Sequence, residues 1–145
     1  MKIKHIHNDG GRAEAGFKGT ARDCVCRAIA IATNTPYKGV YRELESLGLD
    51  DAKRRGKKGR KCHPRTGVGR RIYEPYLLSR GWSWTPTMGI GTGCRVHLRK
   101  DELPSGTIIV RLSRHLATVI DGELHDTYDS SRDGSRCVYG YFSKQ

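Results

Sequence analysis

Apolar residues recur at helical spacing in the segment that begins at Thr20. They fall three or four positions apart and stop near residues 33–34, which predicts an amphipathic helix with one buried face. Thr20 is the expected N-cap, and Asp23 follows in the first turn, where a negative charge is favoured. The buried face is expected to comprise Cys24, Val25, Ala28, Ile29 and Ala32.

Two further helices are predicted before residue 81. The first begins with Pro36 and ends at Gly48, since proline is favoured at a helix start and glycine just past a helix end. The second covers residues 70–80 and contains Pro75, which kinks or shortens it. Their apolar faces comprise Tyr37, Val40, Tyr41, Leu44, Leu47, Ile72, Tyr73, Tyr76 and Leu77.

The rest of the chain has the short apolar runs and turn residues of β-strands. A short strand is expected within residues 1–18, and Asp121-Gly122 is a strong signal for a two-residue hairpin turn. Helices followed by an antiparallel sheet indicate one α+β domain over residues 1–145. The main strands are predicted at residues 82–84, 107–112, 115–120, 123–128 and about 137–142.

The hairpin places two polar residues on one face of the sheet. With a two-residue turn, Ile120 opposes Glu123 and Ala117 opposes Asp126. His115 and Asp126 are then diagonal neighbours, within reach of a carboxylate–imidazole hydrogen bond that fixes the tautomer of the ring. A single histidine on a strand is more often structural, but the carboxylate on the same face favours a functional pair.

Cys24 is the candidate nucleophile because it lies in the first turn of a predicted helix. Exposed amides and the helix dipole lower the pKa of a thiol there, and the thiolate is the reactive form. The alternative is that Cys24 is a small apolar residue of the core. Cys26 lies about 200° around the helix from Cys24, so the two do not share one face.

Other groupings of reactive residues are weaker. His125 opposes Thr118 on the other face of the hairpin, and Asp121 is needed for the turn. The histidines and cysteines lack the paired two-residue spacing of structural zinc sites, so no metal or cofactor is expected. The pairs of possible ligands are His5 with His7, Cys24 with Cys26, Cys62 with His63, and Cys94 with His97.

Charge adds a second candidate function. The formal net charge is +12, and seven of the nine residues from 53 to 61 are cationic. This basic loop, an insertion at about residues 52–69, is expected to be exposed. It is either a solvated, disordered insertion or an arm that binds nucleic acid, a virion component or a host protein through electrostatic attraction. The candidate binding residues are Lys53, Arg54, Arg55, Lys57, Lys58, Arg60 and Lys61.

The environment of the protein is also constrained by its composition. No apolar run reaches the roughly 18 residues that a membrane helix needs, so no membrane partner is expected. Five cysteines are an odd number, and Cys24 and Cys26 are too close in sequence for an easy disulfide, which favours reduced thiols and a cytoplasmic setting.

Several stretches resemble the small papain-like cysteine peptidases of bacteriophages, which are distantly similar to bacteriocin-processing peptidases. They are Asp23–Thr33 with the sequence DCVCRAIAIAT, Glu102–Gly106 with ELPSG, and Arg114–Thr127 with RHLATVIDGELHDT, besides Tyr37 and Val40. The similarity covers roughly residues 20–142. It leaves the N-terminal segment and the basic loop outside.

The resemblance implies a papain-like fold in which N-terminal helices pack against a C-terminal antiparallel β-sheet. By it, Cys24 is the nucleophile of a peptidase or amide hydrolase, His115 the general base and Asp126 the orienting carboxylate, with a peptide or protein as substrate. Lys18 stands where such enzymes usually carry the glutamine of the oxyanion hole. The alternative is a non-catalytic phage protein with this fold, and either form is expected in the host cytoplasm or associated with the virion.

Overall fold

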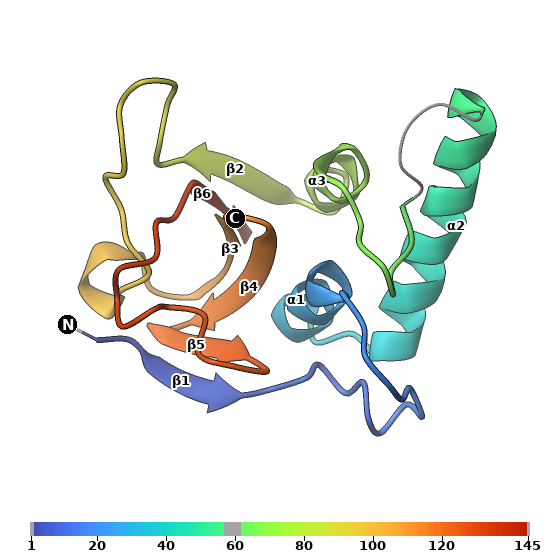
Figure 1. Ribbon diagram of the computed structural model, residues 1–145, viewed down its shortest axis with the longest axis horizontal. Coiled ribbons are helices and arrows are strands. Elements are labelled where there is room, and N and C mark those ends of the chain that lie inside the picture. The colour runs from blue at the N-terminus through green and yellow to red at the C-terminus, as the bar shows by residue number, and fades with distance from the viewer. Residues whose placement is uncertain (1, 57–61, 145) are drawn as a thin grey trace.

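The computed structural model describes residues 2–56 and 62–144 of the chain. Its sheet contains six strands in the order β1-β5-β4-β3-β6-β2, and three α-helices cover one side of it (Figure 1). The elements are β1 (Lys4–His7), α1 (Cys24–Thr33), α2 (Tyr37–Arg55), α3 (Arg70–Leu78), β2 (Trp82–Pro86), the 3-10 helix η1 (Lys100–Glu102), β3 (Thr107–Leu112), β4 (His115–Ile120), β5 (Glu123–Asp126) and β6 (Gly140–Lys144).

The predicted α+β class is confirmed, but the sheet is mixed and not antiparallel. β1 pairs with β5 in parallel, while the other pairs are antiparallel. β1 contains a single aliphatic residue, Ile6, so its sequence pattern says little about its partner or direction. β3 and β4 have the predicted bounds, whereas β5 ends at Asp126 and β6 begins only at Gly140.

The β4–β5 hairpin has the predicted register. Ile120 pairs with Glu123, and Thr118 pairs with His125. Asp121 and Gly122 both have positive φ, at 47° and 76°, as a two-residue turn of type I′ requires. This register fixes which residues lie at the open end of the hairpin.

Helix α1 is buried between the sheet and α2 (Figure 1). Thr118 Oγ1 on β4 donates a hydrogen bond of 2.7 Å to the carbonyl of Ala28, which ties the helix to the sheet. Cys26, predicted to lie away from the buried face, is fully buried and packs with the residues of α1 and α2. The helix therefore has two buried faces, because it has a packing partner on each side.

Helix α1 begins later in the sequence than predicted. The helix begins at Cys24 with Asp23 as its N-cap residue, so the prediction that Thr20 is the N-cap is wrong. Asp23 makes no side-chain capping bond, since its carboxylate is engaged by Arg27 and Tyr37. Cys24 is thus the first residue of the helix, in the first turn as expected.

Helix α2 continues past its predicted end at Gly48 to Arg55. Gly48 is buried inside the helix, and a Cβ there would lie 2.3 Å from the carbonyl oxygen of Cys62. Glycine at this position lets the backbone of Cys62 pack closely against α2 and does not end the helix. Pro75 lies inside α3, which ends at Leu78, two residues before its predicted end.

The prediction of an exposed basic loop at residues 52–69 is only partly right. Lys53, Arg54 and Arg55 form the last turn of α2, while Cys62 and Val68 are buried. The remaining cationic residues of the predicted site, Lys57, Lys58, Arg60 and Lys61, lie outside the described residues.

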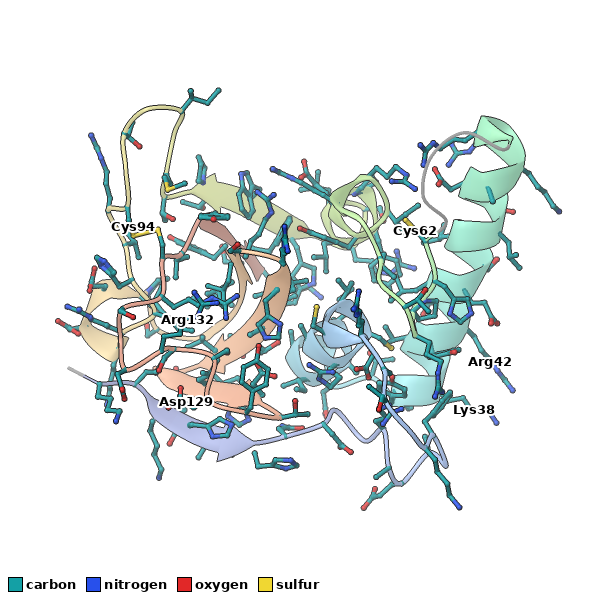
Figure 2. The ribbon with its side chains drawn as sticks, viewed as in Figure 1. Lys38, Arg42, Cys62, Cys94, Asp129 and Arg132 are labelled. Atoms are coloured by element: carbon teal, nitrogen blue, oxygen red, sulfur yellow. A yellow bond between two sulfur atoms is a disulfide. The ribbon has the colours of Figure 1, made fainter. Side chains whose placement is uncertain are left out.

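Two of the five cysteines form a disulfide, Cys94 with Cys137 (Figure 2). The prediction of reduced thiols therefore does not hold for this pair, which is 43 residues apart in sequence. Cys24, Cys26 and Cys62 are free thiols. None of the helices within residues 2–56 and 62–144 is long and apolar enough to span a bilayer.

Candidate active site

Three ends of secondary structure bring Cys24, His115 and Asp126 together. Cys24 is the first residue of α1, His115 the first of β4 and Asp126 the last of β5. Because β4 and β5 are antiparallel neighbours, the start of one lies beside the end of the other. Helix α1 packs on β4 (Figure 1), which brings its N-terminus to the same edge.

His115 and Asp126 form the hydrogen bond that the hairpin register predicts. His115 Nε2 lies 2.6 Å from Asp126 Oδ2, and the two side chains are only 7% and 2% exposed. Burial of a carboxylate is unfavourable unless its oxygens are bonded. Asp126 accepts further bonds from Ser130 Oγ at 2.9 Å and from the Thr127 amide at 2.8 Å.

These contacts set the charge states of the pair. Burial opposes ionisation of Asp126, but the hydrogen bond and charge of His115 outweigh it, together with the bonds from Ser130 and Thr127, and lower the pKa of the carboxyl. Burial likewise disfavours a charged His115. The hydrogen bonds and charges of Asp126 and Cys24 nevertheless raise the pKa of His115 to about 9.

Cys24 is partly buried, and His115 lies close enough to affect its ionisation. Burial opposes ionisation of the thiol, but hydrogen bonding to His115 and the charge of that ring outweigh it and hold the pKa of Cys24 below its usual value. The Leu116 amide and the charge of Arg27 act in the same direction. Cys26, by contrast, is fully buried, and burial is the main cause that raises its pKa to about 12. Of the two neighbouring thiols, Cys24 is therefore the one suited to act as a nucleophile.

A buried ion-pair cluster supports the site from behind. Arg27 pairs with Asp23 and also places Nη2 3.5 Å from Asp126 Oδ1. Tyr37 donates a 2.6 Å hydrogen bond to Asp23, and Arg12 Nε lies 3.4 Å from the same carboxylate. Arg27 is a supporting residue that the sequence predictions above do not include. Its four-residue spacing from Asp23 was the available signal, since such a pair shares a helix face.

A cavity of about 860 Å³ opens beside Cys24 and His115. Its walls come from the start of α1, from residues 62 and 66–73, from the β3–β4 turn and from Tyr139. The nucleophile candidate thus faces a space large enough for a segment of another molecule.

The candidate oxyanion residue Lys18 lies apart from this cavity. Its side chain is exposed, and its carbonyl accepts hydrogen bonds from Arg12 and Arg65 at 3.2 and 3.0 Å. Lys18 is not among the described residues that line the cavity. The amides of the first turn of α1, starting with that of Cys24, lack helical carbonyl partners and are better placed as oxyanion donors.

The competing residues have other contacts. His125 Nδ1 accepts a hydrogen bond of 3.2 Å from Asn8, and Asp121 accepts one of 2.8 Å from the Gly106 amide. Asp121 thereby fixes the turn of the hairpin. Within the part of the chain that the structure describes, no group of three or more His, Cys, Asp or Glu side chains is arranged to hold a metal ion.

Comparisons of the chain with protein-family models, with curated proteins and with solved structures gave no match. The geometry and chemistry of the site itself are therefore the basis for a proposed function.

Proposed function

We propose that the protein is a papain-like cysteine hydrolase that cleaves a peptide or a related amide. The observation that carries this is that Cys24 and His115 line the same cavity, with His115 hydrogen-bonded to Asp126 at 2.6 Å and lowering the pKa of the Cys24 thiol. The pairing of a low-pKa thiol with a high-pKa imidazole favours thiolate and imidazolium, the charge state in which such sites react. The order of the elements, a nucleophile helix followed by strands with the base and carboxylate, also fits the papain-like arrangement.

The proposed reaction has two steps. The Cys24 thiolate attacks the carbonyl carbon of the substrate, an S–C bond forms, and the oxyanion is held by amides at the start of α1. His115 gives its proton to the leaving amine as the C–N bond breaks, which leaves a thioester on Cys24.

Water completes the cycle. His115, now neutral, takes a proton from the water that attacks the thioester, and the C–S bond breaks to release a carboxylic acid. The thiolate and imidazolium are then restored. Asp126 holds the ring of His115 in position and stabilises its positive charge throughout.

Formation of the thioester tests the proposal directly. We expect a p-nitrophenyl ester to release p-nitrophenol in a burst of about one equivalent and to leave the corresponding acyl group on Cys24, as located by mass spectrometry of tryptic peptides. Cys24→Ser removes the burst if the thiol forms the thioester. His115→Gln should slow both acylation and release, since both steps use the ring.

Acylation of Cys62 in place of Cys24, or equal bursts from the parent and Cys24→Ser, would contradict the proposal. A fold that is kept for binding alone predicts no burst and an unreactive Cys24 thiol. Thermal unfolding of each variant serves as the folding control.

A further inference from the structure

The cavity beside Cys24 is lined by an unusual set of charges. Five of its lining residues are arginines, and no aspartate or glutamate is among the described residues that line it. We call these residues, which come from four separate parts of the chain, the arginine wall. They are Arg22, Arg70, Arg71, Arg111 and Arg114.

Two members of the arginine wall have carboxylate partners. Arg70 pairs with Glu74 one turn along α3, and Arg71 Nε lies 3.1 Å from Asp51 Oδ2. These pairs neutralise part of the positive charge on that side of the cavity.

The other three arginines leave a net positive charge in the cavity. Within residues 2–56 and 62–144, no ion pair joins Arg22, Arg111 or Arg114 to a carboxylate. Arg22 and Arg114 are exposed, and the guanidinium of Arg111 lies 5.7 Å from the ring centroid of Tyr139. Repulsion among these cations is relieved when an anion enters, because a cleft lined by one sign of charge attracts the opposite sign.

Two of these three residues also lie close to the reactive groups in sequence. Arg22 is two residues before Cys24, and Arg114 directly precedes His115. A substrate that occupies the cavity at Cys24 therefore lies beside the arginine wall. We infer that the substrate is an acidic peptide segment, whose Asp or Glu side chains or terminal carboxylate pair with Arg22, Arg111 and Arg114.

This inference rests on the proposed hydrolase function. A nucleic acid would satisfy the same charges, but it offers no carbonyl that a cysteine hydrolase cleaves. The position of the arginine wall beside the thiol thus favours a peptide anion over a phosphate backbone.

The rates of two alkylating reagents distinguish the effect of the charge in the cavity from the intrinsic reactivity of the Cys24 thiol. Iodoacetamide is neutral and iodoacetate is an anion, and with both an S–C bond forms at Cys24 while iodide leaves. The iodoacetamide rate reports the thiolate, and the iodoacetate-to-iodoacetamide rate ratio reports attraction of an anion. His115 attracts iodoacetate as well, so the decisive quantity is the change in this ratio when the arginines are replaced.

We expect Arg111→Gln combined with Arg114→Gln to lower the rate ratio on the order of tenfold at low salt, with the iodoacetamide rate little changed. Lys38→Gln combined with Arg42→Gln is the matched control, because both residues are exposed on α2 and point away from the molecule (Figure 2). That variant loses the same charge and should keep the parent ratio. An equal ratio in the parent and the double variant overturns the inference, whereas a slow iodoacetamide reaction in the parent overturns the proposed hydrolase.

Extended probes test the peptide itself. Acetyl-Glu-Glu-Gly chloromethyl ketone should inactivate Cys24 faster than the Gln-Gln-Gly and Lys-Lys-Gly reagents, and this preference should weaken in the double variant and at high salt. Equal rates for the three reagents, or protection of Cys24 by a DNA oligonucleotide but not by the peptide acetyl-Glu-Glu-Gly, would show that the arginine wall does not select an acidic peptide.

Discussion

Arg27 on α1 reaches Asp126 on β5, with Nη2 3.5 Å from Oδ1. The arginine lies one turn after Cys24, so this contact joins the helix of the nucleophile to the strand of the orienting carboxylate. Asp126 uses its other oxygen, Oδ2, for His115. The position of the His115 ring relative to the Cys24 thiol thus depends on Arg27, which is not among the described residues that line the cavity.

We predict that Arg27→Gln destabilises the protein substantially. Arg27 is 11% exposed, and its partners Asp23 and Asp126 are each 2% exposed, so its loss leaves two buried carboxylates short of a cation. Removal of one partner of a buried ion pair typically lowers the free energy of unfolding by about 3–5 kcal/mol. Chemical denaturation monitored by tryptophan fluorescence measures this change.

Lys4→Gln is the control for Arg27→Gln. Lys4 lies 3.6 Å from Glu123 in a pair whose side chains are 72% and 42% exposed, and exposed pairs contribute less than about 1 kcal/mol. Similar decreases in the free energy of unfolding for both variants would mean that the buried contacts of Arg27 stabilise the protein no more than an exposed ion pair does.

Asp126→Asn is predicted to lower the pKa of His115 from about 9. The asparagine can still accept a hydrogen bond, but the negative charge beside the ring is gone. An adjacent opposite charge shifts a pKa by about 1–3 units, so a fall of that size is expected. The imidazole proton resonances of His115, followed by NMR across the pH range, give the value.

Asp121→Asn tests whether this effect is specific. Asp121 is also on the hairpin, but its carboxylate binds the Gly106 amide at the turn. We expect it to leave the pKa of His115 unchanged. A shift with Asp121→Asn and none with Asp126→Asn would show that the wrong carboxylate has been assigned to the ring.

Local pattern was sufficient to predict the hairpin and its polar pair. The two-residue Asp121-Gly122 turn defined the register, and the register placed His115 beside Asp126. Cys24 was recognisable because its helical position is also a local feature. The position of each of these residues within its helix or hairpin is set by residues that are near in sequence.

Features that depend on distant contacts could not be predicted in this way. The parallel pairing of β1 with β5, the disulfide between Cys94 and Cys137 and the second buried face of α1 all require knowledge of which segments meet. Cys26 was misassigned for this reason: periodicity gives the angle between two side chains but not the number of sides on which a helix is packed.

The reactivity of Cys24 should depend on pH through two groups. Its own pKa is held below the usual 9.0, so the thiolate appears as pH rises through that lowered value, and His115 stays protonated up to about 9. The ion pair therefore exists between these limits. We expect the iodoacetamide rate at Cys24 to rise below pH 9, and His115→Gln to move this rise to higher pH.

Peptide mass spectrometry after pulse alkylation resolves Cys24 from the other thiols. Cys26 provides an internal reference, because burial raises its pKa to about 12 and should keep it unreactive over the same range. Coincident profiles for the parent and His115→Gln would mean that the imidazole does not promote ionisation of the thiol.

The last prediction concerns two glycines of α2 that should respond to alanine with opposite signs. At Gly48 a Cβ would lie 2.3 Å from the carbonyl oxygen of Cys62, whereas at Gly39 the nearest atom is Thr35 Cγ2 at 3.9 Å. Alanine is favoured over glycine in a helix by up to about 1 kcal/mol. Gly39→Ala should therefore raise the free energy of unfolding by a fraction of this amount.

Gly48→Ala should lower the free energy of unfolding by about 1–3 kcal/mol, because the clash is with backbone and overrides the helix propensity. Thermal and urea denaturation of the two variants measure both changes in the same helix. Cys62 and Val68 border the cavity beside Cys24, so displacement of this segment should also alter the iodoacetamide rate at Cys24 in Gly48→Ala but not in Gly39→Ala. An increase in the free energy of unfolding for both Gly39→Ala and Gly48→Ala would show that the backbone of residue 62 does not pack closely against α2 at Gly48.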